Sequence, residues 1–312
     1  MMINDLALEA AKHWGGEPVR LIRNRENAVF RMALADGGTA ALRLHRVGYQ
    51  TKPAIQSELW FCEALSAQGL AVPRPLKTQS GHNIVTLQNG RMASAVEWLA
   101  GEPLGEAGVP LSGSVQDQAD RHRALGRLLA RIHQVTIGLT LPPDFSRPSW
   151  DIDGLTGEAP FWGRFWEHPA LTKDEAGEMQ AARQFLRSAL QAHVETTALM
   201  PVHADVLREN ILVDGASLAL IDFDDSGLGF PLYDLGTVLS QNLYEPAFAD
   251  IRAALLEGYN SLRPADARMA DVFTLARCLA SVGWTMPRLA ADDPIMRSHI
   301  ARALRCADMV SN

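Results

Sequence analysis

The sequence has few cysteines and no long apolar run. Its 312 residues include only three cysteines, Cys62, Cys278 and Cys306, which stand far apart and form no paired-cysteine motif. The chain therefore encodes neither a disulfide framework nor a thiolate zinc site, and we expect the cysteines to fill the core. No apolar run approaches the roughly 18 residues that would span a bilayer. The N-terminus carries acids where a signal peptide has a basic start, so we expect a cytoplasmic protein.

Familiar nucleotide-binding signatures are also missing. No G-x-x-x-x-G-K-[ST] or G-x-G-x-x-G pattern occurs, which removes support for P-loop and dinucleotide folds. Lysine is scarce: the chain contains only Lys12, Lys52, Lys77 and Lys173. None of the four lies within a predicted strand.

Charge is distributed unevenly along the chain. Residues 1–97 carry a net charge of +3 and residues 98–312 carry −10, within a total of −7. A net-acidic chain without a long basic run is a poor ligand for a phosphate backbone, so we expect no nucleic-acid partner. The positive part could still hold nucleotide phosphates. No membrane partner is expected, and the sequence assigns no oligomeric state.

The first part of the chain predicts a small antiparallel β lobe. Apolar residues alternate or cluster between turn signals, and Asp36-Gly37-Gly38 is a typical hairpin turn. A run that opens at Pro53 and ends before Gly69 has the proline-first, glycine-last pattern of a helix. The expected strands are residues 19–22, 29–34, 40–44, 84–87 and 93–98, with the helix at 53–68 crossing them.

From about residue 99 the pattern changes to long helices. They are expected at residues 115–135, 159–168, 173–192, 247–262, 269–286 and 294–309. The exception is residues 202–230, where two short apolar runs flank the turn Asp214-Gly215. The class is therefore α+β, with two lobes at residues 1–97 and 98–312.

The densest cluster of polar residues lies within residues 202–230. His203, Asp205 and Asn210 form an H-x-D-x4-N pattern, and Asp222 comes directly after the second apolar run in a D-F-D sequence. Two carboxylates and an amide that converge around a hairpin suit phosphoryl transfer. Asn210 and Asp222 offer oxygens to Mg²⁺, and Asp205 would deprotonate an attacking hydroxyl.

At these two motifs the sequence resembles the aminoglycoside phosphotransferase and choline kinase family, a kinase-like phosphotransferase enzyme family. The matching segments are HADVLREN and LIDFDDSGLGFPLYDLG. The resemblance implies a bilobal protein-kinase-like fold, with residues 1–97 as the nucleotide-binding lobe and residues 98–312 as the catalytic and substrate-binding lobe. It implies ATP or GTP as the donor, His203 and Asp205 as catalytic residues with Asp205 as the base, and Asn210 and Asp222 as Mg²⁺ ligands.

One departure from that family concerns its phosphate-binding lysine. The third strand usually carries it, paired with a glutamate on the crossing helix, but here Arg43 occupies the place and Glu58 is its expected partner. An arginine binds phosphate in a bidentate manner but is longer than lysine. We further expect the loop of residues 25–29, with Asn27, to cover the phosphates, and Glu97 and Leu99 to offer backbone groups to adenine.

Other residues have simpler expected roles. His133 on an apolar helical face is expected in the core, and Asp234 is expected to brace the catalytic loop from the start of a helix. Trp162, Phe165 and Trp166 line a substrate pocket or pack between helices, and the sequence leaves both readings open. Asp224 and Asp225 extend the metal site or face the substrate.

Together these observations favour transfer of a γ-phosphoryl group to the hydroxyl of a small molecule. The acidic second lobe slightly favours an amine-bearing alcohol, such as an aminoglycoside, choline or a homoserine-like compound. A protein acceptor, as in stress-response Ser/Thr kinases of this family, is one alternative. A non-catalytic pseudokinase that serves as an interaction module is another, supported only by the arginine in place of lysine.

Overall fold

The chain forms two compact units. The computed structural model describes residues 2–24, 27–290 and 293–311. Unit 1 holds residues 1–102, 139–147 and 219–224, and unit 2 holds residues 103–138, 148–218 and 225–312. The chain thus returns to unit 1 twice after leaving it. The division into residues 1–97 and 98–312 treats each lobe as one continuous stretch and stays a prediction.

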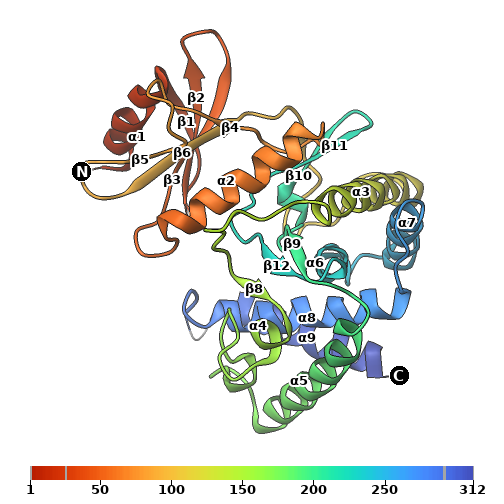
Figure 1. Cartoon of the computed structure of the whole chain (residues 1–312). Coiled ribbons are helices and arrows are strands. Elements are labelled where there is room, and N and C mark those ends of the chain that lie inside the picture. Colours follow the sequence, from red (N-terminus) through yellow and green to blue (C-terminus); the bar gives the residue numbers. More distant parts are fainter. Residues whose placement is uncertain (1, 25–26, 291–292, 312) are drawn as a thin grey trace. The chain divides into compact units, whose positions relative to one another are not determined.

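Unit 1 is built on an antiparallel sheet with the strand order β1-β2-β3-β6-β4, and β5 pairs with β6. Asp36 and Gly37 turn the chain between β2 and β3, where Gly37 has a φ of 86° that favours glycine. The strands are β1 (Gly16–Asn24), β2 (Ala28–Leu34), β3 (Thr39–Leu44), β4 (Pro75–Leu76), β5 (Ile84–Thr86) and β6 (Met92–Glu97) (Figure 1).

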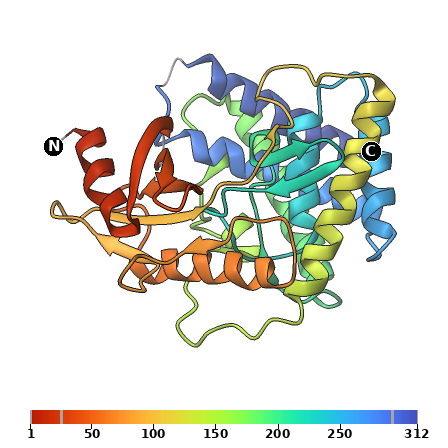
Figure 2. The ribbon, with the colours of Figure 1, turned by 90° about the horizontal axis from the view of Figure 1, so that it is seen from above.

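Two helices cover the two faces of this sheet. Residues of α1 (Ile3–Ala11) share one buried cluster with Leu42 and Leu44 of β3, and residues of α2 (Lys52–Ala67) share another with Ile84. The strands lie between α1 and α2 in both views (Figures 1 and 2). Because side chains alternate along a strand, residue 43 of β3 belongs to the face opposite Leu42 and Leu44.

Unit 2 is mainly helical. Its helices are α3 (Val115–Thr136), α4 (Ile152–Thr156), α5 (Lys173–Val194), α6 (Leu232–Asn242), α7 (Phe248–Asn260), α8 (Ala267–Thr285) and α9 (Pro294–Ser311). Strands β8 (Ser149–Trp150), β12 (Gly227–Gly229) and β9 (Met200–Val202) form a small sheet in that order. A further sheet, β11 (Ser217–Leu220), β10 (Ile211–Asp214) and β7 (Glu102–Pro103), contains strands in which the chain passes from one unit to the other.

Glycines allow the closest helix packing in unit 2. Helices α3 and α7 lie side by side (Figures 1 and 2). A Cβ atom added to Gly126 of α3 would lie 2.2 Å from the carbonyl oxygen of Leu255, and one on Gly258 of α7 would lie 2.0 Å from that of Arg123. Each glycine therefore admits the backbone of the facing helix.

Most expected elements are present, but the helix predicted at residues 159–168 is wrong. Only a short 3₁₀ turn (Phe165–Glu167) forms there. Pro160 lacks an amide proton, and Gly163 has a φ of 97°, which a helix cannot contain. The segment is held instead by aromatic packing, with the rings of Trp150 and Trp162 4.8 Å apart.

None of the helices among the described residues is long and apolar enough to cross a membrane.

Candidate active site

Arg43 lies at the centre of a charged cluster in unit 1. Strand alternation places it on the α2 side of the sheet, where its Nη1 atom lies 2.5 Å from Glu58 Oε1. Its Nη2 atom donates to Asp222 Oδ1 at 3.2 Å, and Asp224 Oδ1 lies 3.8 Å from Nη1. The structure thus brings together Arg43, its expected partner Glu58 and the first carboxylate of the D-F-D segment.

The electrostatics of this cluster keep the guanidinium charged. The side chain of Arg43 is 14% exposed and that of Glu58 is 3% exposed. Burial alone would lower the pKa of Arg43, but Glu58, Asp222 and Asp224 outweigh it and raise the pKa above its ordinary value. Three carboxylates surround one cation, and Asp222, 39% exposed, is the most accessible of them.

The D-F-D segment is anchored by its middle residue. Phe223 is buried and packs edge-on against Phe61 of α2, with the ring centroids 5.7 Å apart. Asp222 has a φ of 64°, which is costly for a residue other than glycine and typical of functional sites. Asp224 Oδ2 accepts from the side-chain amide of Asn27 at 3.1 Å. The anchor holds the Asp222 carboxylate beside Arg43.

The residues expected to hold phosphates and adenine are placed as follows. Asn27 donates to Asp224 and accepts from the backbone of Arg46 at 3.0 Å, while residues 25 and 26 of the same loop lie outside the described residues. The amide proton of Glu97 at the end of β6 donates to the carbonyl of Arg74 at 2.8 Å. Leu99 lies two residues beyond it, outside the strand.

The catalytic-loop motif lies in unit 2, and Asp234 holds its backbone. Asp234 is fully buried at the start of α6 and accepts from the amide protons of His203 and Ala204 at 3.1 and 2.7 Å. It also accepts from His133 Nε2 at 3.0 Å. Ala204 has a φ of 65°, so these bonds stabilise a costly turn. The expectations that Asp234 braces this loop and that His133 is a core residue are confirmed.

We expect Asp234→Asn to destabilise the protein by about 3 kcal/mol. Hydrogen bonds to a buried charged group are strong, and the NH₂ group of asparagine cannot accept from the backbone N–H that one aspartate oxygen now binds. Urea unfolding followed by circular dichroism measures this loss. The matched control is Asp250→Asn at the exposed start of α7, whose loss should stay within about 1 kcal/mol. Equal losses in the two variants would contradict the bracing role.

The rest of the motif orients Asp205. The amide nitrogen of Asn210 donates to the backbone oxygen of Asp205 at 2.9 Å and to its Oδ2 atom at 2.8 Å. The backbone N–H of Asp205 donates to His203 Nδ1 at 3.2 Å. These bonds fix the Asn210 side chain through its amide nitrogen. They leave its side-chain oxygen available to accept another bond.

Sequence reasoning missed the arginine that contacts Asp205. Arg277 of α8 donates from Nη2 to Asp205 Oδ1 at 2.6 Å, and its guanidinium carbon lies 4.5 Å from the ring centroid of Trp162. Burial alone would lower the pKa of Arg277, but Asp205, Tyr233 and Asp225 together raise it. The available signal was an arginine inside the apolar run FTLARCLASV, since arginine is rarely buried without a partner.

A second buried arginine, Arg208, has a structural role. Arg208, within the loop motif, donates to Asn242 Oδ1 at 2.7 Å and lies 2.5 Å from Glu245 Oε1. Both charged side chains of this pair are less than a tenth exposed. Because its donors are used inside the protein, Arg208 ties the catalytic loop to the end of α6.

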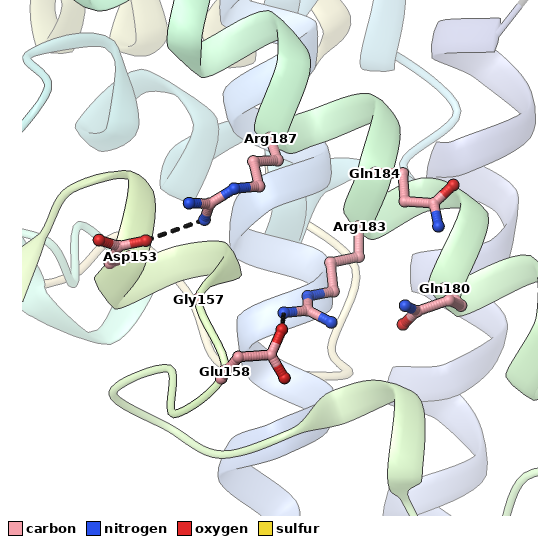
Figure 3. A pocket seen from close by; sticks show the side chains of 7 residues that line it. All are labelled: Asp153, Gly157, Glu158, Gln180, Arg183, Gln184 and Arg187. Carbon is pink, nitrogen blue, oxygen red and sulfur yellow. Dashed lines mark hydrogen bonds and ion pairs between the residues drawn. The ribbon is translucent and has the colours of Figure 1, made fainter.

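The pocket drawn in Figure 3 is a separate feature of unit 2. Its two arginines, Arg183 and Arg187 of α5, point to Glu158 and Asp153, at 2.5 and 2.9 Å (Figure 3). None of the residues that line this pocket is among the expected site residues. Its arginines therefore provide controls for variants at the candidate site.

The sequence predicts two metal ligands, Asp222 in unit 1 and Asn210 in unit 2. The described residues contain no cluster of three or more metal-ligating His, Cys, Asp or Glu side chains. Mg²⁺ does not require one, since it is commonly bound by one or two carboxylates together with substrate phosphates. The accessible Asp222 carboxylate and the fixed Asn210 amide are oxygen donors of the kind that such an ion takes.

Comparison with known proteins identifies the relatives of this chain. The family model described as "Phosphotransferase enzyme family" matches residues 18–272. A homoserine kinase from Pseudomonas aeruginosa is 30% identical over 278 residues, which cover 85% of this chain and 78% of that protein.

Solved structures support the same fold. A microcompartment-associated aminopropanol kinase superposes with a TM-score of 0.83 at 25% identity, covering 98% of this chain and 96% of that one. The amicoumacin kinase hAmiN, solved with AMP-PNP and Ca²⁺, gives a TM-score of 0.77 at 18% identity, covering 98% and 92%. The expected α+β, protein-kinase-like fold is confirmed.

Proposed function

Because the chain belongs to the phosphotransferase enzyme family and is a small-molecule kinase that acts on an alcohol group, we propose that its donor is ATP with Mg²⁺. We further propose that its acceptor is a short amino alcohol. The observation that carries the proposal is the Asp205 carboxylate, which Asn210 and the loop bonded to Asp234 hold in one orientation. Such a fixed carboxylate suits a base that receives the proton of the acceptor hydroxyl.

The remaining loop residues support Asp205. His203 is fully buried and accepts from the backbone of Asp205, so its proposed role is to position the base rather than to touch the acceptor. Asn210 and Asp222 are the proposed Mg²⁺ ligands, each offering one oxygen to a hard cation. A bound divalent ion would neutralise charge that develops on the phosphoryl oxygens.

Arg43 and its neighbours are proposed to serve the nucleotide. The guanidinium stays charged and is held by Glu58, as a phosphate-binding cation must be held to act without reorganisation. Asn27, Glu97 and Leu99 remain proposed contacts of the nucleotide, Asn27 near the phosphates and the other two at adenine. GTP is the alternative donor.

The proposal of an amino alcohol draws on the relatives. The names of two of them specify homoserine and aminopropanol, and each of these compounds is a short chain with one hydroxyl and one amine. The net charge of −10 on residues 98–312 also favours a ligand that carries a positive group.

Transfer of labelled γ-phosphate tests the function. The purified chain, Mg²⁺ and γ-labelled ATP or GTP are incubated with short amino alcohols, choline, aminoglycosides and a protein mixture, and the products are separated by chromatography. We expect a phosphate ester of a short amino alcohol, formed from ATP. Labelled protein without any labelled small molecule would contradict the proposal.

A further inference from the structure

Arg277 offers hydrogen-bond donors next to the proposed base. Its side chain is 7% exposed, and one nitrogen is bonded to Asp205. A guanidinium carries five N–H donors in a planar fork and no acceptor. The Nη1 atom of Arg277 is buried with no hydrogen-bond partner among the described residues, so the guanidinium has a donor to spare.

Trp162 adds a second donor at the same place. Its ring stacks against the guanidinium of Arg277, and the indole Nε1–H is buried with no hydrogen-bond partner within the described part of the chain. The whole residue is 9% exposed. A buried donor without a partner costs about 1 to 3 kcal/mol, and in a native protein it calls for a specific explanation such as a missing ligand or water.

Both groups are donors, so a ligand that satisfies both is an acceptor, and a guanidinium favours an anionic acceptor over a neutral one. The planar fork of arginine matches a carboxylate in a bidentate manner. Asp225 lies within electrostatic reach of the same guanidinium. The neighbourhood therefore presents charge of both signs, as a zwitterion would require.

We propose that Arg277 and Trp162 form a carboxylate subsite for the acceptor, which makes the acceptor a short hydroxy amino acid rather than a simple amino alcohol. This proposal rests on the proposed function. Because Arg277 touches Asp205 directly, a molecule whose hydroxyl reaches Asp205 and whose carboxylate reaches Arg277 is only a few bonds long.

Two acceptors that differ only by the carboxylate test the proposal. L-Homoserine and 3-aminopropan-1-ol share the hydroxyl, the amine and the chain between them. With Mg-ATP we expect kcat/KM for L-homoserine to exceed that for 3-aminopropan-1-ol by about 100-fold or more, because a site with buried donors strongly rejects an analogue that leaves them unpaired. Calorimetry with ADP and Mg²⁺ should likewise detect binding of L-homoserine and not of the amino alcohol.

Variants assign the preference to these residues. Trp162→Phe keeps an aromatic ring but removes the donor, so the ratio of the two kcat/KM values should fall about tenfold, as expected for one lost hydrogen bond. Arg277→Met should abolish the preference. The matched controls are Arg183→Met and Trp166→Phe. Arg183 also stacks on a tryptophan, with its guanidinium carbon 3.8 Å from the ring centroid of Trp166, and it pairs with Glu158. Both controls should keep the parent ratio.

The alternatives give different results. If Arg277 only orients Asp205 or contacts the transferred phosphoryl group, Arg277→Met lowers turnover of both acceptors equally and Trp162→Phe leaves the ratio unchanged, which overturns the subsite. A parent enzyme that prefers 3-aminopropan-1-ol, or that neither binds nor phosphorylates L-homoserine, overturns it as well. Phosphorylation of any other amino alcohol in that case leaves the proposed function standing, whereas no phosphorylated small molecule removes both.

Discussion

Asp205→Asn should lower kcat by about 10²- to 10⁴-fold, the usual contribution of a general base. The exchange preserves the size of the side chain, and Asn210, His203 and Asp234 still hold the loop. An amide cannot accept the proton of the acceptor hydroxyl, whereas the nucleotide is not expected to depend on Asp205. Affinity for Mg-ATP should therefore stay nearly unchanged. Steady-state kinetics measure kcat, and calorimetry measures nucleotide binding.

The exchange also removes a charged partner of Arg277, so a structural effect must be separated from a chemical one. Thermal unfolding of Asp205→Asn reports any loss of stability. Asp214→Asn, at the exposed end of β10, serves as the control and should keep the parent kcat. A variant that folds normally and turns over acceptor at the parent rate would disprove the role of Asp205 as a base.

Local sequence patterns predicted much of unit 1. The turn at Asp36 and Gly37 and the helix that opens near Pro53 follow from the conformations that these residues allow. The pairing of Arg43 with Glu58 was expected from the resemblance to the kinase-like family, whose strand cation pairs with a glutamate on the next helix, and the two side chains are in contact. The role of this pair in nucleotide binding stays a prediction that the Arg43 variants test.

Contacts between distant segments were harder to foresee. Arg277 and Asp205 are 72 residues apart, and Trp162 lies in a segment that was wrongly predicted as helical. Hydrophobic periodicity reports which face of an element is buried, but not which other element covers it. The polar partner of a buried arginine therefore emerges only once α8 is packed.

Backbone conformation was a second limit. Ala204 and Asp222 both have positive φ values, near 65°, although neither is a glycine. Rules that assign glycine to such positions would not select them. Each conformation costs about 1 to 2 kcal/mol, and each residue belongs to one of the two motifs that point to phosphoryl transfer. Contacts made by Asp234 and Phe223 stabilise these turns, which is consistent with strain retained for function.

The second large effect is expected at Arg43. Arg43→Met removes the cation beside Asp222, so kcat/KM for ATP should fall by about 10²- to 10³-fold, the usual loss when a fixed donor to a developing charge is removed. The same exchange leaves Glu58 buried without its partner, which should cost about 3 to 5 kcal/mol of stability. Activity and stability would then fall together, and a single variant could not separate them.

A double variant separates the two effects. In Arg43→Met with Glu58→Gln the buried carboxylate is gone, so urea unfolding should recover a large part of the lost stability. The cation that would bind phosphate is still missing, and kcat/KM for ATP should stay as low as in Arg43→Met alone. Glu58→Gln by itself keeps Arg43 beside Asp222 and should retain more activity than either variant at Arg43. If calorimetry finds the parent affinity for ATP in the double variant, or if its activity returns together with its stability, Arg43 acts only as a partner for Glu58 and another residue must hold the phosphates.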